Sequence, residues 1–114
     1  MSLYELTFIV RQDAPKSDVT KLADDYAKQI KDAGGKVEKN EYWGLRNLAY
    51  VINKNRKGHY AFLAIDAESA AVREVERKLG LDENVVRHMT IRVDEFTETP
   101  AGLLPNSGGY EDAA

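Results

Sequence analysis

Residues 59–93 read HYAFLAIDAESAAVREVERKLGLDENVVRHMTIRV and hold a strand, a helix and a second strand in direct succession. The segments 59–66 and 85–93 are rich in the aromatic and branched residues that strands favour. Between them, Ser69 is the expected N-cap and Gly80 the expected end of a helix. The apolar face of that helix consists of Val72, Val75 and Leu79.

The first part of the chain repeats the strand–helix succession. Residues 3–10, LYELTFIV, alternate so that the even positions are expected to face a core, namely Leu6, Phe8 and Val10. A helix follows, with Ser17 as its expected N-cap and the pair Gly34-Gly35 as its end. Its predicted apolar face consists of Val19, Leu22, Ala23, Tyr26, Ile30 and Ala33.

A hairpin joins the two halves. Residues 36–52 predict a long strand that bends at Gly44, and NKNRKG at 53–58 predicts the loop. Gly58 is the expected left-handed position of that loop. The element order is therefore β-α-β-β-α-β, which predicts an α+β fold: a ferredoxin-like sandwich with a four-stranded antiparallel sheet and two helices on one face.

Side-chain alternation predicts which residues face away from the helices. In 59–66, Leu63 and Ile65 are the expected core positions, so Tyr60 and Phe62 are expected on the open face. The last strand leaves two alternatives. Its pattern alone buries Met89, Ile91 and Val93, but Arg87 shares their parity and is expected on the open face, which would bring Met89 and Ile91 there with it. The second alternative is the one we favour.

The composition limits the classes of function. The chain has 114 residues, 43% hydrophobic and 31% charged, and contains no cysteine, which excludes disulfides, thiolate metal sites and a cysteine nucleophile. No apolar run approaches the roughly 18 residues of a membrane span, and the N-terminus lacks a basic signal region, so a cytoplasmic location is expected. We expect one domain at 1–96 and a flexible acidic tail at 97–114.

The charge is unevenly distributed. The net charge is −3, yet Tyr42 to Ile65 contains no acid and four bases, namely Arg46, Lys54, Arg56 and Lys57. One interpretation is a solvated hairpin whose charges block edge-to-edge aggregation. The other is an RNA surface, on which the bases neutralise phosphates and a tyrosine stacks on an unpaired base.

Catalytic and metal-binding patterns are missing from the sequence. His59 and His88 are isolated and are expected at strand surfaces or edges. The paired acids Asp24-Asp25 and Asp82-Glu83 are adjacent rather than convergent, and no glycine-rich phosphate loop precedes a helix. The sequence therefore predicts no enzyme, no cofactor, no metal and no small-molecule substrate.

Four segments together resemble bacterial small-subunit ribosomal protein six: YELTFIV, WGLRNLAYVINK, GHYAFL and NVVRHM, spread over residues 3–93. The resemblance implies the same sandwich fold, no catalytic activity, and a place in the small ribosomal subunit. It also implies binding to the central domain of small-subunit ribosomal RNA together with small-subunit ribosomal protein eighteen, as a heterodimer.

The resemblance also suggests site residues. Those implied to contact RNA are Tyr4, Arg46, Lys54, Tyr60 and Arg87, with Arg56, Lys57 and Arg92 as further candidates. Candidates for the protein partner are Trp43, Gly44, Leu45, Phe62, Met89 and Ile91. Two other functions remain open on this fold. A metabolite sensor would need a ligand pocket at a dimer interface, and an acid–base enzyme would need a convergent pair of histidine and acid.

Overall fold

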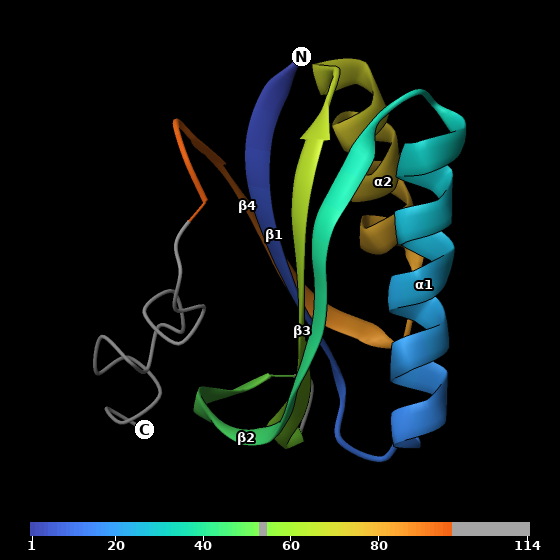
Figure 1. The fold of residues 1–114 in the computed structure, drawn as a ribbon. Coiled ribbons are helices and arrows are strands. Elements are labelled where there is room, and N and C mark those ends of the chain that lie inside the picture. The colour runs from blue at the N-terminus through green and yellow to red at the C-terminus, as the bar shows by residue number, and fades with distance from the viewer. Residues whose placement is uncertain (53–54, 97–114) are drawn as a thin grey trace.

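The structure is a computed structural model that describes residues 1–52 and 55–96. Within them the chain forms the predicted order of elements (Figure 1): β1 (Ser2–Arg11), α1 (Lys16–Asp32), β2 (Lys36–Ile52), β3 (Asn55–Ala67), α2 (Ser69–Leu81) and β4 (Val85–Val93). Lys54 and the predicted tail at 97–114 lie outside the described residues.

The strands form one antiparallel sheet in the order β2-β3-β1-β4. Both helices cover the same face of this sheet, as Figure 1 shows. The ferredoxin-like sandwich expected from the sequence is therefore confirmed. The two central strands, β1 and β3, are hydrogen-bonded on both sides, whereas β2 and β4 are the edges.

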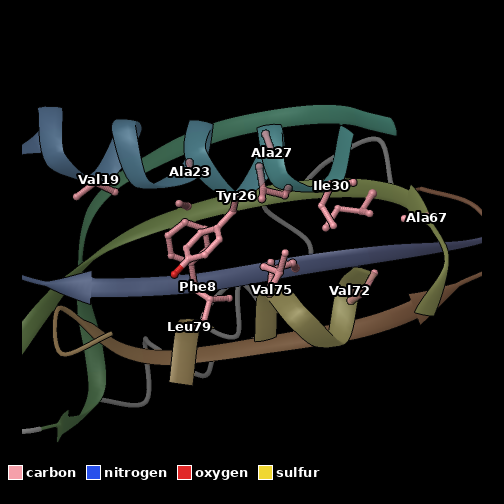
Figure 2. Close-up of a cluster of buried hydrophobic side chains, with 14 of the residues drawn as sticks. Phe8, Val19, Ala23, Tyr26, Ala27, Ile30, Ala67, Val72, Val75 and Leu79 are labelled. Atoms are coloured by element: carbon pink, nitrogen blue, oxygen red, sulfur yellow. The ribbon is translucent and has the colours of Figure 1, made fainter. Parts of the chain in front are cut away.

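The main core lies between the sheet and the helices (Figure 2). Leu6, Phe8 and Val10 of β1 face it as predicted, and each is at most 2% exposed. The Phe8 ring meets Tyr26 of α1 edge to face, with centroids 6.0 Å apart. Burying a side chain of this size contributes about 1.5–3 kcal/mol, so the core is the main stabilising element of the fold.

The helix starts differ from the sequence-based expectation by one or two residues. Helix α1 has Pro15 as its N-cap and α2 has Glu68, and neither end has a side-chain capping bond. At each end the carbonyl of the N-cap residue accepts backbone amide protons from the first turn. Ser17 and Ser69, predicted as caps, thus lie inside the helices, because the chain reverses direction one or two residues earlier than the capping pattern indicated.

Of the two predicted helix ends, one is confirmed and one is wrong. Helix α1 stops before Gly34, which has a φ of +90°, in agreement with the prediction. The predicted stop at Gly80 is wrong, since α2 continues to Leu81 and Gly80 lies within its last turn.

Strand β3 of the hairpin begins earlier than the sequence indicated. Strand β3 begins at Asn55, so Arg56 and Lys57 lie in the strand and not in the predicted loop. The left-handed position predicted for Gly58 is also wrong, because the described glycines with positive φ are Gly34 and Gly44. Glycine is needed at position 58 for lack of space, because a Cβ atom there would lie 2.2 Å from Cγ2 of Ile9.

Gly44 produces the predicted bend of the long strand. Its φ is +97°, a conformation that L side chains rarely adopt, and the register with β3 shifts between Tyr42 and Gly44. Trp43 is the extra residue of this bulge. The bulge therefore changes the direction in which the next side chains of β2 point.

Candidate nucleic-acid and protein interface

The sheet register decides which side chains of β4 lie on the open face. Arg87, Met89 and Ile91 stand opposite the odd positions of β1, namely Ile9, Thr7 and Glu5. Since the even positions of β1 pack under the helices, the odd positions face away from them. The second alternative for β4, with Met89 and Ile91 on the open face, is thereby confirmed.

An aromatic stack covers the middle of the open face. The Trp43 indole lies on the Phe62 ring, with centroids 4.9 Å apart and an interplanar angle of 15°. Trp43 Nε1 also donates a 3.0 Å hydrogen bond to Oε1 of Glu41, which fixes the indole. Phe62 is buried beneath it, so a partner that approaches this region meets Trp43 first.

Tyr60 faces the open side as predicted, but its ring is buried. It forms a small cluster with Ile9 and Leu48, against which Trp43 and Val86 pack. Tyr60 is 0% exposed. Stacking of this ring on an RNA base therefore requires the cluster to open first.

Two apolar side chains of β4 remain accessible on the open face. Met89 is 42% and Ile91 39% exposed, and they are neighbours on the same side of an edge strand. Their partners in β1, Thr7 and Glu5, are buried in the middle of the sheet. Adjacent exposed apolar groups on a surface without a covering helix are typical of a protein-binding surface.

Cationic side chains gather at the hairpin end of the sheet. Arg46 Nε donates a 3.2 Å hydrogen bond to the carbonyl oxygen of Trp43, which ties the guanidinium to the bulge. Arg56 and Lys57 are exposed on β3. In residues 1–52 and 55–96, none of these three side chains forms an ion pair, so their charges are available to phosphate.

His59 is not at the surface as predicted but is buried, at 6% exposure. Its Nδ1 lies 2.8 Å from the Tyr42 hydroxyl, and the Lys16 ammonium lies 5.2 Å from the centre of the Tyr42 ring. These contacts join β2, β3 and the start of α1 at the helix-side face. Sequence spacing did not reveal the pair, because only the register of the hairpin brings the two residues together.

Three of the predicted site residues lie on the opposite face of the sheet. Tyr4 packs against the helix-side core, and Arg92 is its register partner on β4. Leu45 pairs with His59 and is exposed on that same side. The structure therefore divides the predicted residues between two surfaces instead of bringing them together.

The described residues were considered for a metal site, a ligand cavity and a membrane-spanning helix. Among them, no three histidine, aspartate or glutamate side chains could hold a metal ion. A cavity between α1 and β2 has a volume of about 180 Å³. None of the described helices is long and apolar enough to cross a membrane.

Comparison with known proteins identifies the family. The family described as Ribosomal protein S6 matches residues 3–92. The small ribosomal subunit protein bS6 of Rickettsia prowazekii is 50% identical over 106 residues, which cover 93% of this chain and 88% of the relative. The protein of the same name from Paramagnetospirillum magneticum is 52% identical over 104 residues, covering 91% and 72%.

A solved structure agrees with this assignment. The 30S ribosomal protein S6 of Thermotoga maritima superposes with a TM-score of 0.75 at 27% identity, covering 81% of this chain and 87% of that one. These relatives are named as proteins of the small ribosomal subunit. The expected family and the expected location, in the small subunit of the bacterial cytoplasm, are confirmed. This chain belongs to the ribosomal protein S6 family, whose members are proteins of the small ribosomal subunit.

Proposed function

We propose that this protein binds the central domain of small-subunit ribosomal RNA together with small-subunit ribosomal protein eighteen, with which it forms a heterodimer. The observation that supports this function best is a single row across the open face. Gly44, Tyr60, Ile9 and Arg87 are successive register partners from β2 to β4. Next to this row on β4, the exposed side chains of Arg87 and Met89 are neighbours on the open face, so a cationic group adjoins an apolar one on the same surface.

Protein eighteen binds through the apolar part of this surface. Met89 and Ile91 supply accessible apolar area, and the half-buried Trp43 extends it toward β2. Phe62 supports the indole from below, so it contributes through Trp43 and not by direct contact. Aromatic residues and methionine are enriched at protein interfaces, in agreement with this assignment.

RNA binds at the adjoining hairpin end. Arg46, Arg56 and Lys57 present positive charge there, and Arg87 lies on the open face between them and Met89. The chain as a whole carries a net charge of −3, so its long-range attraction to RNA is weak. A basic partner that binds next to these residues supplies the remaining positive charge, which explains why the two proteins bind RNA together.

The test is the affinity for a central-domain RNA fragment with and without protein eighteen, measured by fluorescence anisotropy. We expect weak binding by the protein alone and at least a tenfold gain with the partner. Arg46→Ala should weaken the ternary complex, because a phosphate contact is lost. Arg77→Ala is the matched control, since Arg77 is an exposed arginine already paired with Glu74, with Nη2 2.7 Å from Oε2. Equal affinity with and without protein eighteen would contradict the proposal.

A further inference from the structure

A side chain of the β1–α1 loop reaches the β2–β3 hairpin. Oε1 of Gln12 accepts a 3.0 Å hydrogen bond from the backbone amide of Lys57. Gln12 directly follows β1, whereas Lys57 lies in β3, 45 positions further along the chain. Figure 1 shows the loop and the hairpin at the same end of the sheet. The bond therefore joins the end of β1 to the part of the hairpin that carries Arg56 and Lys57.

This hydrogen bond extends the support of β3 beyond the end of its neighbour. The backbone pairing of β1 with β3 ends at Arg11 and Gly58. Lys57 is the next residue of β3, and the carboxamide of Gln12 supplies the acceptor that a longer β1 would have offered. On the other side of β3, Lys57 with Asn47 is the last pair before the register with β2 shifts. The bond thus holds β3 at the point where regular pairing is interrupted.

The loop that presents Gln12 is itself held in place. The backbone amide of Arg11 donates a 2.8 Å hydrogen bond to the carbonyl oxygen of Asn84, and the Arg11 carbonyl accepts a 3.1 Å bond from the amide of Ala14. The Arg11 guanidinium also makes two hydrogen bonds to the carboxylate of Asp13, of 2.7 and 3.1 Å. Because the backbone around Gln12 is already ordered, its side chain has less conformational freedom to lose on bonding to the hairpin.

The orientation of the hairpin matters because its cations are exposed. Arg56 and Lys57 lie in the solvent, and neither forms an ion pair within residues 1–52 and 55–96. If the backbone beneath such side chains moves, it must be ordered when RNA binds, and this ordering lowers the affinity. A hairpin that is already held before binding avoids part of this loss.

We propose that Gln12 is a positioning residue for RNA binding. Its carboxamide fixes the backbone at Lys57 and thereby holds Arg56 and Lys57 in the orientation in which they meet phosphate. The inference rests on the RNA binding proposed above and adds a determinant outside the hairpin, in a loop that the charge pattern of the sequence did not indicate. The affinity for RNA then depends on an uncharged side chain that acts through the hairpin backbone.

Hydrogen exchange of the Lys57 amide tests the bond itself, in the full chain without RNA. Gln12→Leu removes the acceptor at similar side-chain size, so this amide should exchange about three- to tenfold faster, as expected for one hydrogen bond. Gln12→Glu keeps an acceptor oxygen and should retain the protection. The matched control is Gln29→Leu, because Oε1 of Gln29 accepts a 3.1 Å bond from Nζ of Lys78 away from the hairpin. The control should leave the exchange of the Lys57 amide unchanged.

The affinity for RNA tests the positioning role, with the full chain, protein eighteen and the central-domain RNA fragment over a salt series. Gln12→Leu should weaken the ternary complex about three- to tenfold. Its slope of log affinity against log salt should stay within about half a unit of wild type, because no cation is removed. Lys57→Ala should instead lower this slope by about one unit. Urea unfolding verifies that each variant is folded before binding is compared.

Three outcomes overturn the inference. If wild type binds RNA and Gln12→Leu matches the Gln29→Leu control in amide exchange or in affinity, Gln12 does not position the hairpin, while the proposed function stands. If the salt slope of Gln12→Leu falls as far as that of Lys57→Ala, a phosphate contact itself is lost, and the role is not one of positioning. If wild type binds no RNA even with protein eighteen, the proposed function fails and the inference fails with it.

Discussion

The two faces of the sheet are built from the same strands but differ in what covers them. On β3, Leu63 and Ile65 pack under the helices, while Tyr60 and Phe62 face the open side, and all four are 0% exposed. Helices cover the first pair, whereas Trp43 and the small cluster around Ile9 cover the second. Full burial therefore does not by itself distinguish a helix-packed core from a face that is covered by only a few side chains.

Because of this difference, the core that stabilises the fold and the surface that is accessible to a partner lie on opposite faces of the sheet. The helix-side face carries the main apolar core, which includes the Phe8 and Tyr26 rings. The open face leaves Met89 and Ile91 accessible beside buried Thr7 and Glu5. A partner can cover the second face without disturbing the first.

The largest expected effect compares two phenylalanines on opposite faces. Phe8→Ala should lower the free energy of unfolding by about 3–5 kcal/mol, because the cavity lies beneath both helices and cannot collapse. Phe62→Ala should cost less, about 2–3 kcal/mol, because Trp43 can settle into the space. Urea unfolding with linear extrapolation measures both. An equal or larger loss for Phe62→Ala would show that the open face is a second core of comparable rigidity.

The next effect tests the close approach at Gly58. Gly58→Ala should destabilise the fold by about 1–3 kcal/mol, because the new Cβ would lie 2.2 Å from Cγ2 of Ile9. Gly80→Ala is the matched control in α2, where the nearest atom, Nε2 of His88, would be 3.9 Å from the new Cβ. The control should stabilise by about 0.5–1 kcal/mol, because alanine favours the helix. Thermal unfolding of both variants should shift the midpoint in opposite directions, and shifts of the same sign would contradict this account.

A smaller change in stability accompanies the loss of the exposed apolar pair. Met89→Ser with Ile91→Ser should change the unfolding free energy by no more than about 1 kcal/mol, since both side chains are already partly in water. The affinity for protein eighteen, measured by calorimetry, should fall at least tenfold. Leu81→Ser, on a side chain 70% exposed at the end of α2, is the control and should leave the affinity unchanged. Unchanged binding by the double variant would remove the open face from the interface.

The smallest effect is electrostatic and lies on the outer surface of α2. The Arg77 guanidinium hydrogen-bonded to Glu74 lowers the pKa of that carboxyl from its ordinary 4.5. Because the folded-state pKa is the lower one, the stabilisation is present above about pH 4.5 and is lost as the pH falls through the folded value. Arg77→Gln should return the Glu74 pKa toward its ordinary value in an NMR titration. The pKa of Asp13, which Arg11 lowers through a hydrogen bond, should stay where it is.

Local patterns predicted the elements but not their connections in detail. The alternation of β1 and the helical spacing of α1 and α2 correctly assigned core positions such as Phe8 and Val75. The caps at Ser17 and Ser69 and the left-handed turn at Gly58 were wrong, because each depends on where the chain reverses in three dimensions. Gly58 has no side chain because Ile9 comes too close, and Ile9 is almost fifty positions away in the sequence.

The sequence by itself determined the order of the elements, the fold class and the acid-free cationic stretch, since these follow from local periodicity and residue type. The family followed from the resemblance of four segments between residues 3 and 93 to a known family. Only the tertiary structure decided the grouping of the site residues. Strand register assigns Met89 and Ile91 to the open face and Tyr4 and Arg92 to the helix side. A shift of one residue would exchange these faces, and register depends on contacts between distant strands that no single segment specifies.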